Sequence, residues 1–186
     1  MPNRITKLFM DTETFADKWV RTRLNDMEFY VIHLPLDSIL ITNGRLGQLV
    51  KEGEYTGTLI FAPRNQFSSW EDAFVGVFKK HVYHWESWTD FYANDVSKEE
   101  MAPHLNNFWI PQYVNTNQIR TVNHTEYMKS FEDELIDYGV SKDFIEDLQD
   151  QITNLEIVTL TDQRDDQTVF GISDSLAFIY MRIINH

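Results

Sequence analysis

The chain has 186 residues and a formal net charge of −13 at pH 7, with 29 Asp and Glu residues against 16 Lys and Arg. This length predicts a single domain over residues 1–186, and the acidic excess argues against a nucleic-acid partner, which would need a basic face. Cysteine is absent, which excludes disulfides and thiolate metal sites and is typical of a reducing compartment. No apolar run approaches the ~20 residues that a membrane-spanning helix needs, so we expect a cytoplasmic protein without a membrane partner.

The start of the chain predicts a short strand followed by a helix. The strand is expected over the apolar-rich run 5–10. Asp11 and Thr12 can cap a helix that runs to about residue 24. Phe15 and Trp19 are spaced four residues apart on that helix, so both should face the core.

An antiparallel meander should come next. Three runs rich in β-branched and aromatic residues, 28–34, 38–42 and 57–62, predict strands. Asn43-Gly44 follows the second of these runs and is a strong hairpin signal.

The clearest helix signal begins at Ser68. Ser68 and Glu71 have the spacing of a capping box, in which each side chain binds the backbone N–H of the other residue. Apolar residues then recur at helical spacing, and this helix should lie on the meander. The expected inner face is Trp70, Phe74, Val77, Phe78 and His81.

The second half of the chain mixes strands and helices. Strands are expected over 109–114, 119–122, 155–160 and 168–172, with a polar turn over 161–167. Residues 126–152 predict two helices joined at Gly139, and Ser173 or Asp174 should cap a last helix that runs to about residue 184. Because the order shows no alternation of strands and helices, the fold class should be α+β with a largely antiparallel sheet.

Acidic residues are concentrated in one part of the chain. Residues 1–81 contain ten acidic and ten basic residues, whereas residues 126–174 contain fourteen acidic and three basic ones. Such a cluster is commonly a solvated surface that keeps a protein soluble. The alternative is a face of the 126–152 helices that docks on a basic protein partner.

The stretch 165–180, DDQTVFGISDSLAFIY, resembles the closing signature of a family of small uncharacterised bacterial proteins. The segments GVSKDFIEDL at 139–148 and ILITN at 39–43 are also similar to that family. The resemblance implies a bacterial, cytosolic, single-domain protein, and it supplies no catalytic residues.

Aromatic residues are unusually dense between residues 67 and 113. Helical spacing explains those on the predicted inner face as core, but it leaves Trp85, Trp88, Tyr92 and Trp109 unexplained. Trp and Tyr dominate binding hot spots. These four residues are therefore either further core or an exposed groove for a protein or a small ligand.

His81 and His84 are three residues apart and could share a helix face, with Glu86 nearby as a carboxylate ligand. Neutral imidazoles and a carboxylate suit zinc or another divalent metal. His81 also falls on the apolar face of its helix, which favours a buried structural histidine.

These patterns lead to one principal hypothesis and two alternatives. The principal hypothesis is a non-enzymatic interaction protein, such as an inhibitor or an immunity-like protein, without a cofactor. Its expected contact residues are Trp85, Trp88, Tyr92, Trp109, Asp133, Asp137 and Asp147. The alternatives are a metal-dependent hydrolase that uses His81, His84 and a carboxylate, and a small-ligand binder with a Trp-lined pocket.

Overall fold

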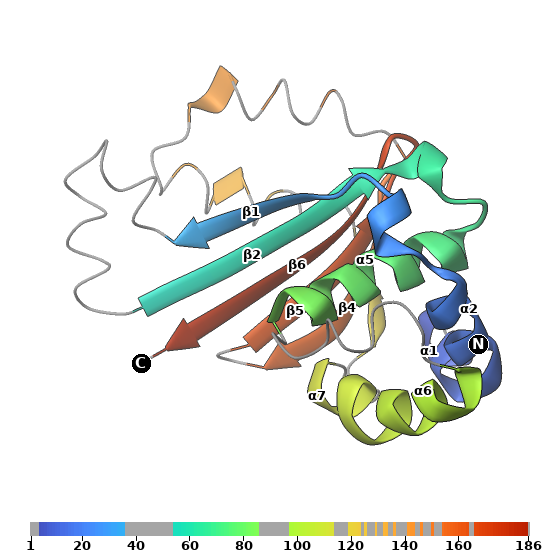
Figure 1. Ribbon diagram of the computed structural model, residues 1–186. Helices are drawn as coiled ribbons and strands as arrows, with labels where there is room; N and C mark the ends of the chain where they lie inside the picture. The colour runs from blue at the N-terminus through green and yellow to red at the C-terminus, as the bar shows by residue number, and fades with distance from the viewer. Residues whose placement is uncertain are drawn as a thin grey trace.

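The computed structural model packs an antiparallel sheet against a layer of helices, which confirms the predicted α+β class (Figure 1). It describes residues 4–35, 54–85, 97–113, 119–123, 154–163 and 166–185, with single positions between 125 and 150. The described helices are α1 (Arg4–Met10), α2 (Thr12–Arg21), η1 (Leu24–Asp26), η2 (Arg64–Gln66), α5 (Trp70–Trp85), α6 (Lys98–His104), η4 (Leu105–Trp109) and α7 (Ile110–Tyr113). The described strands are β1 (Tyr30–Pro35), β2 (Glu54–Pro63), β3 (Arg120–Val122), β4 (Glu156–Gln163), β5 (Asp166–Ile172) and β6 (Leu176–Asn185).

Within the described parts of the chain the sheet has six strands in the order β1-β2-β6-β5-β4-β3, and every neighbouring pair is antiparallel. The strands predicted over 28–34, 57–62, 119–122, 155–160 and 168–172 are confirmed, with small shifts at their ends. The strand predicted over 38–42 and the Asn43-Gly44 hairpin lie outside the described residues.

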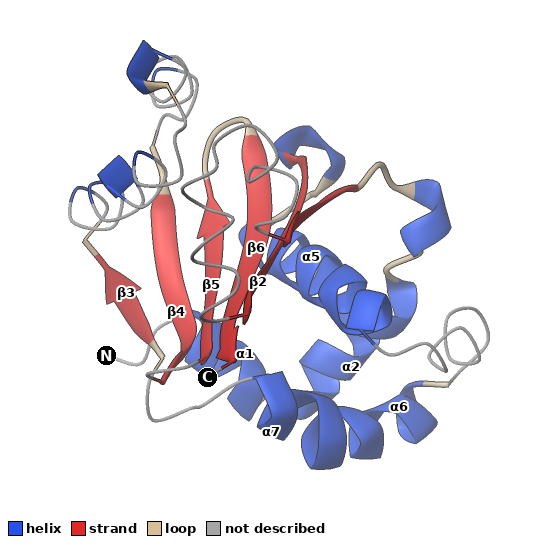
Figure 2. Cartoon of the chain, turned by 90° about the vertical axis from the view of Figure 1, so that its left-hand side faces the viewer, coloured by secondary structure: helices blue, strands red, loops and turns tan. Residues whose placement is uncertain are grey.

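Both faces of the sheet bury apolar side chains because neighbours along a strand point to opposite sides. Ile179 of β6 lies opposite Ile60 and Phe170 and belongs to the core under the helices. The next residue, Tyr180, lies opposite Val169 and joins a second buried cluster on the other face. Figure 2 shows α2, α5, α6 and α7 on one side of the sheet and the described positions between 125 and 150 on the other.

Aromatic side chains fill the core between α5 and the sheet. Phe74 stacks on Phe78 with ring centroids 5.5 Å apart and meets Phe170 of β5 edge to face at 5.0 Å. Trp19 of α2 meets Phe78 at 6.0 Å. The inner face predicted for the 68–81 helix is confirmed, since all five of its members are buried. Such pairs stabilise the fold by about 0.5–1.5 kcal/mol each beyond the area they bury.

The strand predicted over 5–10 is wrong, because these residues form the helix α1. Ile5, Leu8 and Phe9 are the buried residues of this segment. Their spacing of three and four residues matches one face of a helix and not the alternation of a strand. α2 follows directly, and its predicted cap is confirmed: the Asp11 side chain accepts a hydrogen bond from the Thr14 N–H, and Phe15 and Trp19 are buried.

The cap of α5 lies one residue later than predicted. The Ser69 hydroxyl, not that of Ser68, accepts a hydrogen bond from a backbone N–H, that of Asp72, at 3.0 Å. Ser68 instead donates its hydroxyl hydrogen to the Asp72 carboxylate. Either serine of the Ser68-Ser69 pair could cap a helix. Because α5 begins at Trp70, the cap is Ser69.

The helix predicted after residue 173 is wrong, because 176–185 is the strand β6. The Ser173 hydroxyl does accept a hydrogen bond from the Leu176 N–H, at 3.0 Å, as a helix cap would. The Ser173 N–H also donates to the Leu176 carbonyl at 2.8 Å, which closes a tight turn between β5 and β6. β6 then pairs with β2 on one side and β5 on the other, and these long-range pairings outweigh the local cap signal.

Two smaller predictions are corrected. Residues 109–113 are helical, at the end of η4 and in α7, and not a strand. The polar turn predicted over 161–167 is shorter, because β4 extends to Gln163 and β5 begins at Asp166. The two helices predicted over 126–152 are described only at scattered positions, which are helical except for Ser141, so their hairpin arrangement stays a prediction.

One glycine permits close packing at the centre of the sheet. Gly171 of β5 lies opposite Phe178 of β6, and the ring of Phe178 covers it. A Cβ at position 171 would lie 2.1 Å from the Phe178 Cζ, closer than any real contact. The position therefore requires glycine.

Candidate functional site

The predicted aromatic groove is only partly described. Trp85 is the last residue of α5 and Trp109 the last residue of η4. Trp88 and Tyr92 lie outside the described residues. A groove that joins all four side chains therefore stays a prediction.

The predicted metal ligands include a fully buried histidine. His81 is 0% exposed on the inner face of α5, whereas His84, one turn later, is half-buried. Burial, with a smaller contribution from the charge of His84, lowers the pKa of His81 to about 3. Glu86 lies outside the described residues, and among those that are described no group of three His, Asp or Glu side chains could hold a metal ion. The metal site stays a prediction.

Most of the described charged positions between 129 and 150 are exposed, and we refer to them, with the half-buried Glu132 and the exposed Ile136, as the acidic face. Asp133 is exposed there, whereas Asp137 and Asp147 lie outside the described residues. The spacing of these positions, three or four residues within each group, places them along one side of helical turns. The acidic face comprises Lys129, Glu132, Asp133, Ile136, Lys142, Asp143, Glu146 and Asp150.

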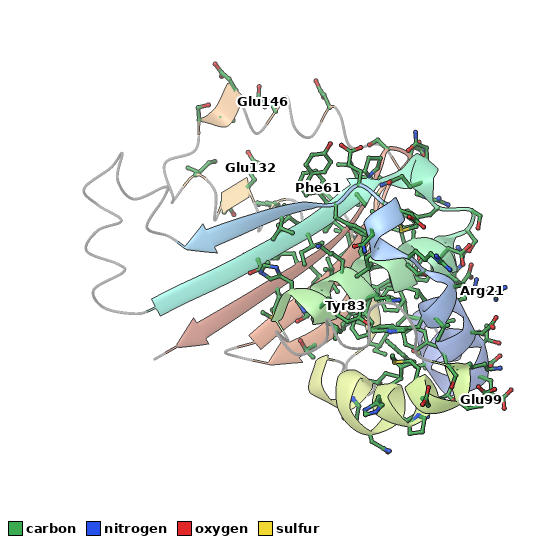
Figure 3. The ribbon with its side chains drawn as sticks, viewed as in Figure 1. Arg21, Phe61, Tyr83, Glu99, Glu132 and Glu146 are labelled. Carbon is green, nitrogen blue, oxygen red and sulfur yellow. The ribbon has the colours of Figure 1, made fainter. Side chains whose placement is uncertain are left out.

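The acidic face lies on the far side of the sheet from the helical layer. Figure 3 shows Glu132 and Glu146 well separated from Arg21 of α2 and Glu99 of α6. Glu146 faces Lys142 at 4.0 Å, which at an exposed position is a weak ion pair. Ile136 is 43% exposed among these charges.

A cavity of about 630 Å³ lies at the surface of the helical layer and is open to solvent, since Arg21, Arg23 and Asp26 in its lining are exposed. It is bounded by the end of α2 and η1 on one side, and by η2 and the start of α5 on the other. Lys18 and Asp72 line it and form an ion pair at 2.5 Å, which joins α2 to α5. Although burial raises the pKa of Asp72, hydrogen bonds from Lys18, Ser68 and Ser69 hold it below its ordinary value.

Gln66 fixes a second wall of this cavity. Its side-chain oxygen accepts from the Glu28 N–H at 2.7 Å, and its side-chain nitrogen donates to the Glu28 carbonyl at 2.9 Å. One amide therefore satisfies both backbone groups of Glu28 and ties η2 to the segment that precedes β1. A wall held in this way needs little ordering when a ligand binds.

Lys79 of α5 holds the end of α2 in place next to the cavity. Its side chain is 2% exposed, and its Nζ donates to the carbonyls of Trp19 and Thr22, both at 2.7 Å. Thr22 lines the cavity. The Lys79 ammonium thus satisfies carbonyls at the end of α2, where a cation also complements the helix dipole. Burial lowers the pKa of Lys79 to about 8.

The sequence patterns did not indicate this cavity. Lys18 and Arg21 lie in the last turn of α2, where basic residues are ordinary because they complement the helix dipole. The sequence does indicate that Lys79 is buried. It lies four residues after Val75 and three before Val82, on the same helix face, and both valines are buried. A lysine in the apolar stripe of a helix must find acceptors inside the protein.

None of the described helices is both long and apolar enough to cross a membrane. Comparisons of this chain with protein-family models, curated proteins and solved structures give no match. The resemblance of 165–180 to a family of small bacterial proteins stays a prediction.

Proposed function

We propose that this protein is a non-enzymatic interaction protein that docks a basic protein partner on the acidic face. The observation that carries the proposal is an exposed isoleucine, Ile136, in a segment whose described carboxylates are all exposed except that of Glu132, which is half-buried. Protein interfaces commonly combine an apolar centre with a polar rim. The same combination on this face suits a partner with an apolar pocket surrounded by Lys and Arg.

The distribution of charge supports the same proposal. The acidic face contains five carboxylates and two lysines, so its local charge is negative. Long-range attraction between complementary charges speeds the encounter of two proteins, and the apolar contact then slows their dissociation. The carboxylates would therefore govern the association rate, and Ile136 the lifetime of the complex.

The proposal predicts a specific loss of affinity in Ile136→Ala. With the wild-type chain as bait at low salt, we expect capture of a basic protein that is released by high salt. The purified partner should then bind Ile136→Ala at least about fivefold more weakly, since a central interface residue contributes more than ~1 kcal/mol. Binding can be measured by isothermal titration calorimetry.

Met10→Ala is the matched control, because Met10 is 77% exposed at the end of α1, in the helical layer. We expect its affinity for the partner to equal that of the wild type. Equal affinities in Ile136→Ala and the wild type, or equal losses in the two variants, would refute docking through the acidic face.

A further inference from the structure

The cavity between α2 and α5 contains charges that are already paired and charges that are not. Lys18 is paired with Asp72, and Arg21 is paired with Asp17 on its own helix. Arg23 and Asp26, at the two ends of η1, also line the cavity. Within the described part of the chain, neither of these two side chains forms an ion pair.

Arg23 and Asp26 are placed to act on one ligand. They flank a single 3-10 turn, which the hydrogen bond from the Asp26 N–H to the Arg23 carbonyl closes at 3.1 Å. Residues three apart on such a turn lie on the same side of it. The cavity wall therefore offers one cation and one anion side by side.

The balance of charge limits the class of ligand. A phosphate or a simple carboxylate would be attracted by Arg23 but repelled by Asp26 and by Asp72. A metal cation would meet the opposite problem, with Arg21 and Arg23 nearby. A ligand that carries both an ammonium and a carboxylate satisfies both unpaired side chains and repels neither.

The rest of the lining combines polar side chains, those of Thr22, Gln66 and Ser68, with two apolar ones. Met27 and Phe67 line the cavity beside these charges. Phe67 packs closely on α5 at Gly76, where an added Cβ would lie 2.5 Å from the Phe67 Cε1. The volume of about 630 Å³ lies within the range of small-molecule sites.

We propose that this cavity binds a small zwitterion, an amino acid with an apolar side chain. Arg23 holds the carboxylate, Asp26 holds the ammonium, and Met27 and Phe67 contact the side chain. Gln66 and Lys79 position the walls through Glu28 and Thr22. This site is separate from the acidic face, so it can be tested without the protein partner.

The test is isothermal titration calorimetry of the full chain with L-leucine, L-methionine and L-phenylalanine as probes. We expect at least one of them to bind. Its deaminated acid and its decarboxylated amine should each bind at least about tenfold more weakly, because each lacks one of the two charges. Arg23→Gln and Asp26→Asn should each weaken binding of the amino acid by a similar factor.

Lys7→Gln and Glu13→Gln are matched controls, because they make the same charge changes at exposed positions that do not line the cavity. Both should bind the amino acid as the wild type does. Arg23 and Asp26 are exposed, so their variants should fold, which circular dichroism would verify. No binding of any probe at millimolar concentration, or equal binding of the amino acid and its deaminated acid, would overturn the proposal.

Discussion

Replacing Lys79 by methionine should lower the free energy of unfolding by about 2 kcal/mol at pH 7. Methionine keeps the buried stem of the side chain but removes the donor to the Trp19 and Thr22 carbonyls. Each lost hydrogen bond from a charged group costs roughly 1.5–3 kcal/mol, and the relief of burying a charge offsets part of that loss. Urea unfolding, followed by tryptophan fluorescence, measures the difference.

The same variant should change how stability depends on pH. The pKa of Lys79 is about 8 in the folded chain, below its ordinary value of 10.5. Between these two values the unfolded chain binds more protons, so this residue makes the wild type more stable as the pH rises through that window, by up to about 3 kcal/mol. Lys79→Met should lack this increment.

Lys80→Met is the matched control for both measurements. Lys80 is the next residue of α5 and is only half-buried, with its Nζ 5.9 Å from the ring of Phe29. The free energy of unfolding of Lys80→Met should be less than about 1 kcal/mol below that of the wild type, as is usual for substitutions at partly exposed positions. Equal losses in the two variants would show that Lys79 does not support the end of α2.

Acid should unfold the wild-type chain more readily than His81→Gln. The pKa of His81 is about 3 in the folded chain against an ordinary value of 6.5. His81 therefore contributes stability that is fully present above pH 6.5 and is lost as the pH falls toward 3, because only the unfolded chain takes up the proton. At pH 4.5 the loss should be about 3 kcal/mol.

Urea titrations at a series of pH values between 7 and 4 would measure this effect. His81→Gln should lose less stability across that range, whatever the substitution costs at neutral pH. His104→Gln, at a half-buried position of α6, is the control that replaces a histidine but leaves the buried His81 imidazole in place. Parallel pH profiles for the wild type and His81→Gln would contradict a neutral, buried His81.

Much of the fold could be predicted where the residues of a single element, through its cap or its apolar spacing, are enough to identify it. Asp11 with Phe15 and Trp19 defined α2, and the run 155–160 defined most of β4. The segment 176–185 could not be assigned in this way. The hydrogen bond from the Leu176 N–H to the Ser173 hydroxyl is common to a helix start and to this tight turn, and only the pairing of β6 with β2 and β5 distinguishes them.

The candidate sites were less predictable than the fold. Charge counts indicated the acidic region, and Asp133 is exposed as expected, but nothing in the pattern singled out Ile136. The cavity depends on residues far apart in the chain: Lys18 meets Asp72, and Gln66 meets Glu28. Contacts at such separations have no periodicity that a sequence could reveal.

The acidic face as a docking surface is tested most directly by the association rate constant of the captured partner across a range of salt concentrations. The chains to compare are the wild type, Asp133→Asn/Asp143→Asn on the acidic face, and Glu13→Gln/Glu99→Gln on the helical layer, which has the same net charge. We predict slower association with a weaker salt dependence for the acidic-face variant alone, because steering depends on where the charge lies. Equal slowing of both double variants, or no slowing of either, would contradict the proposed function.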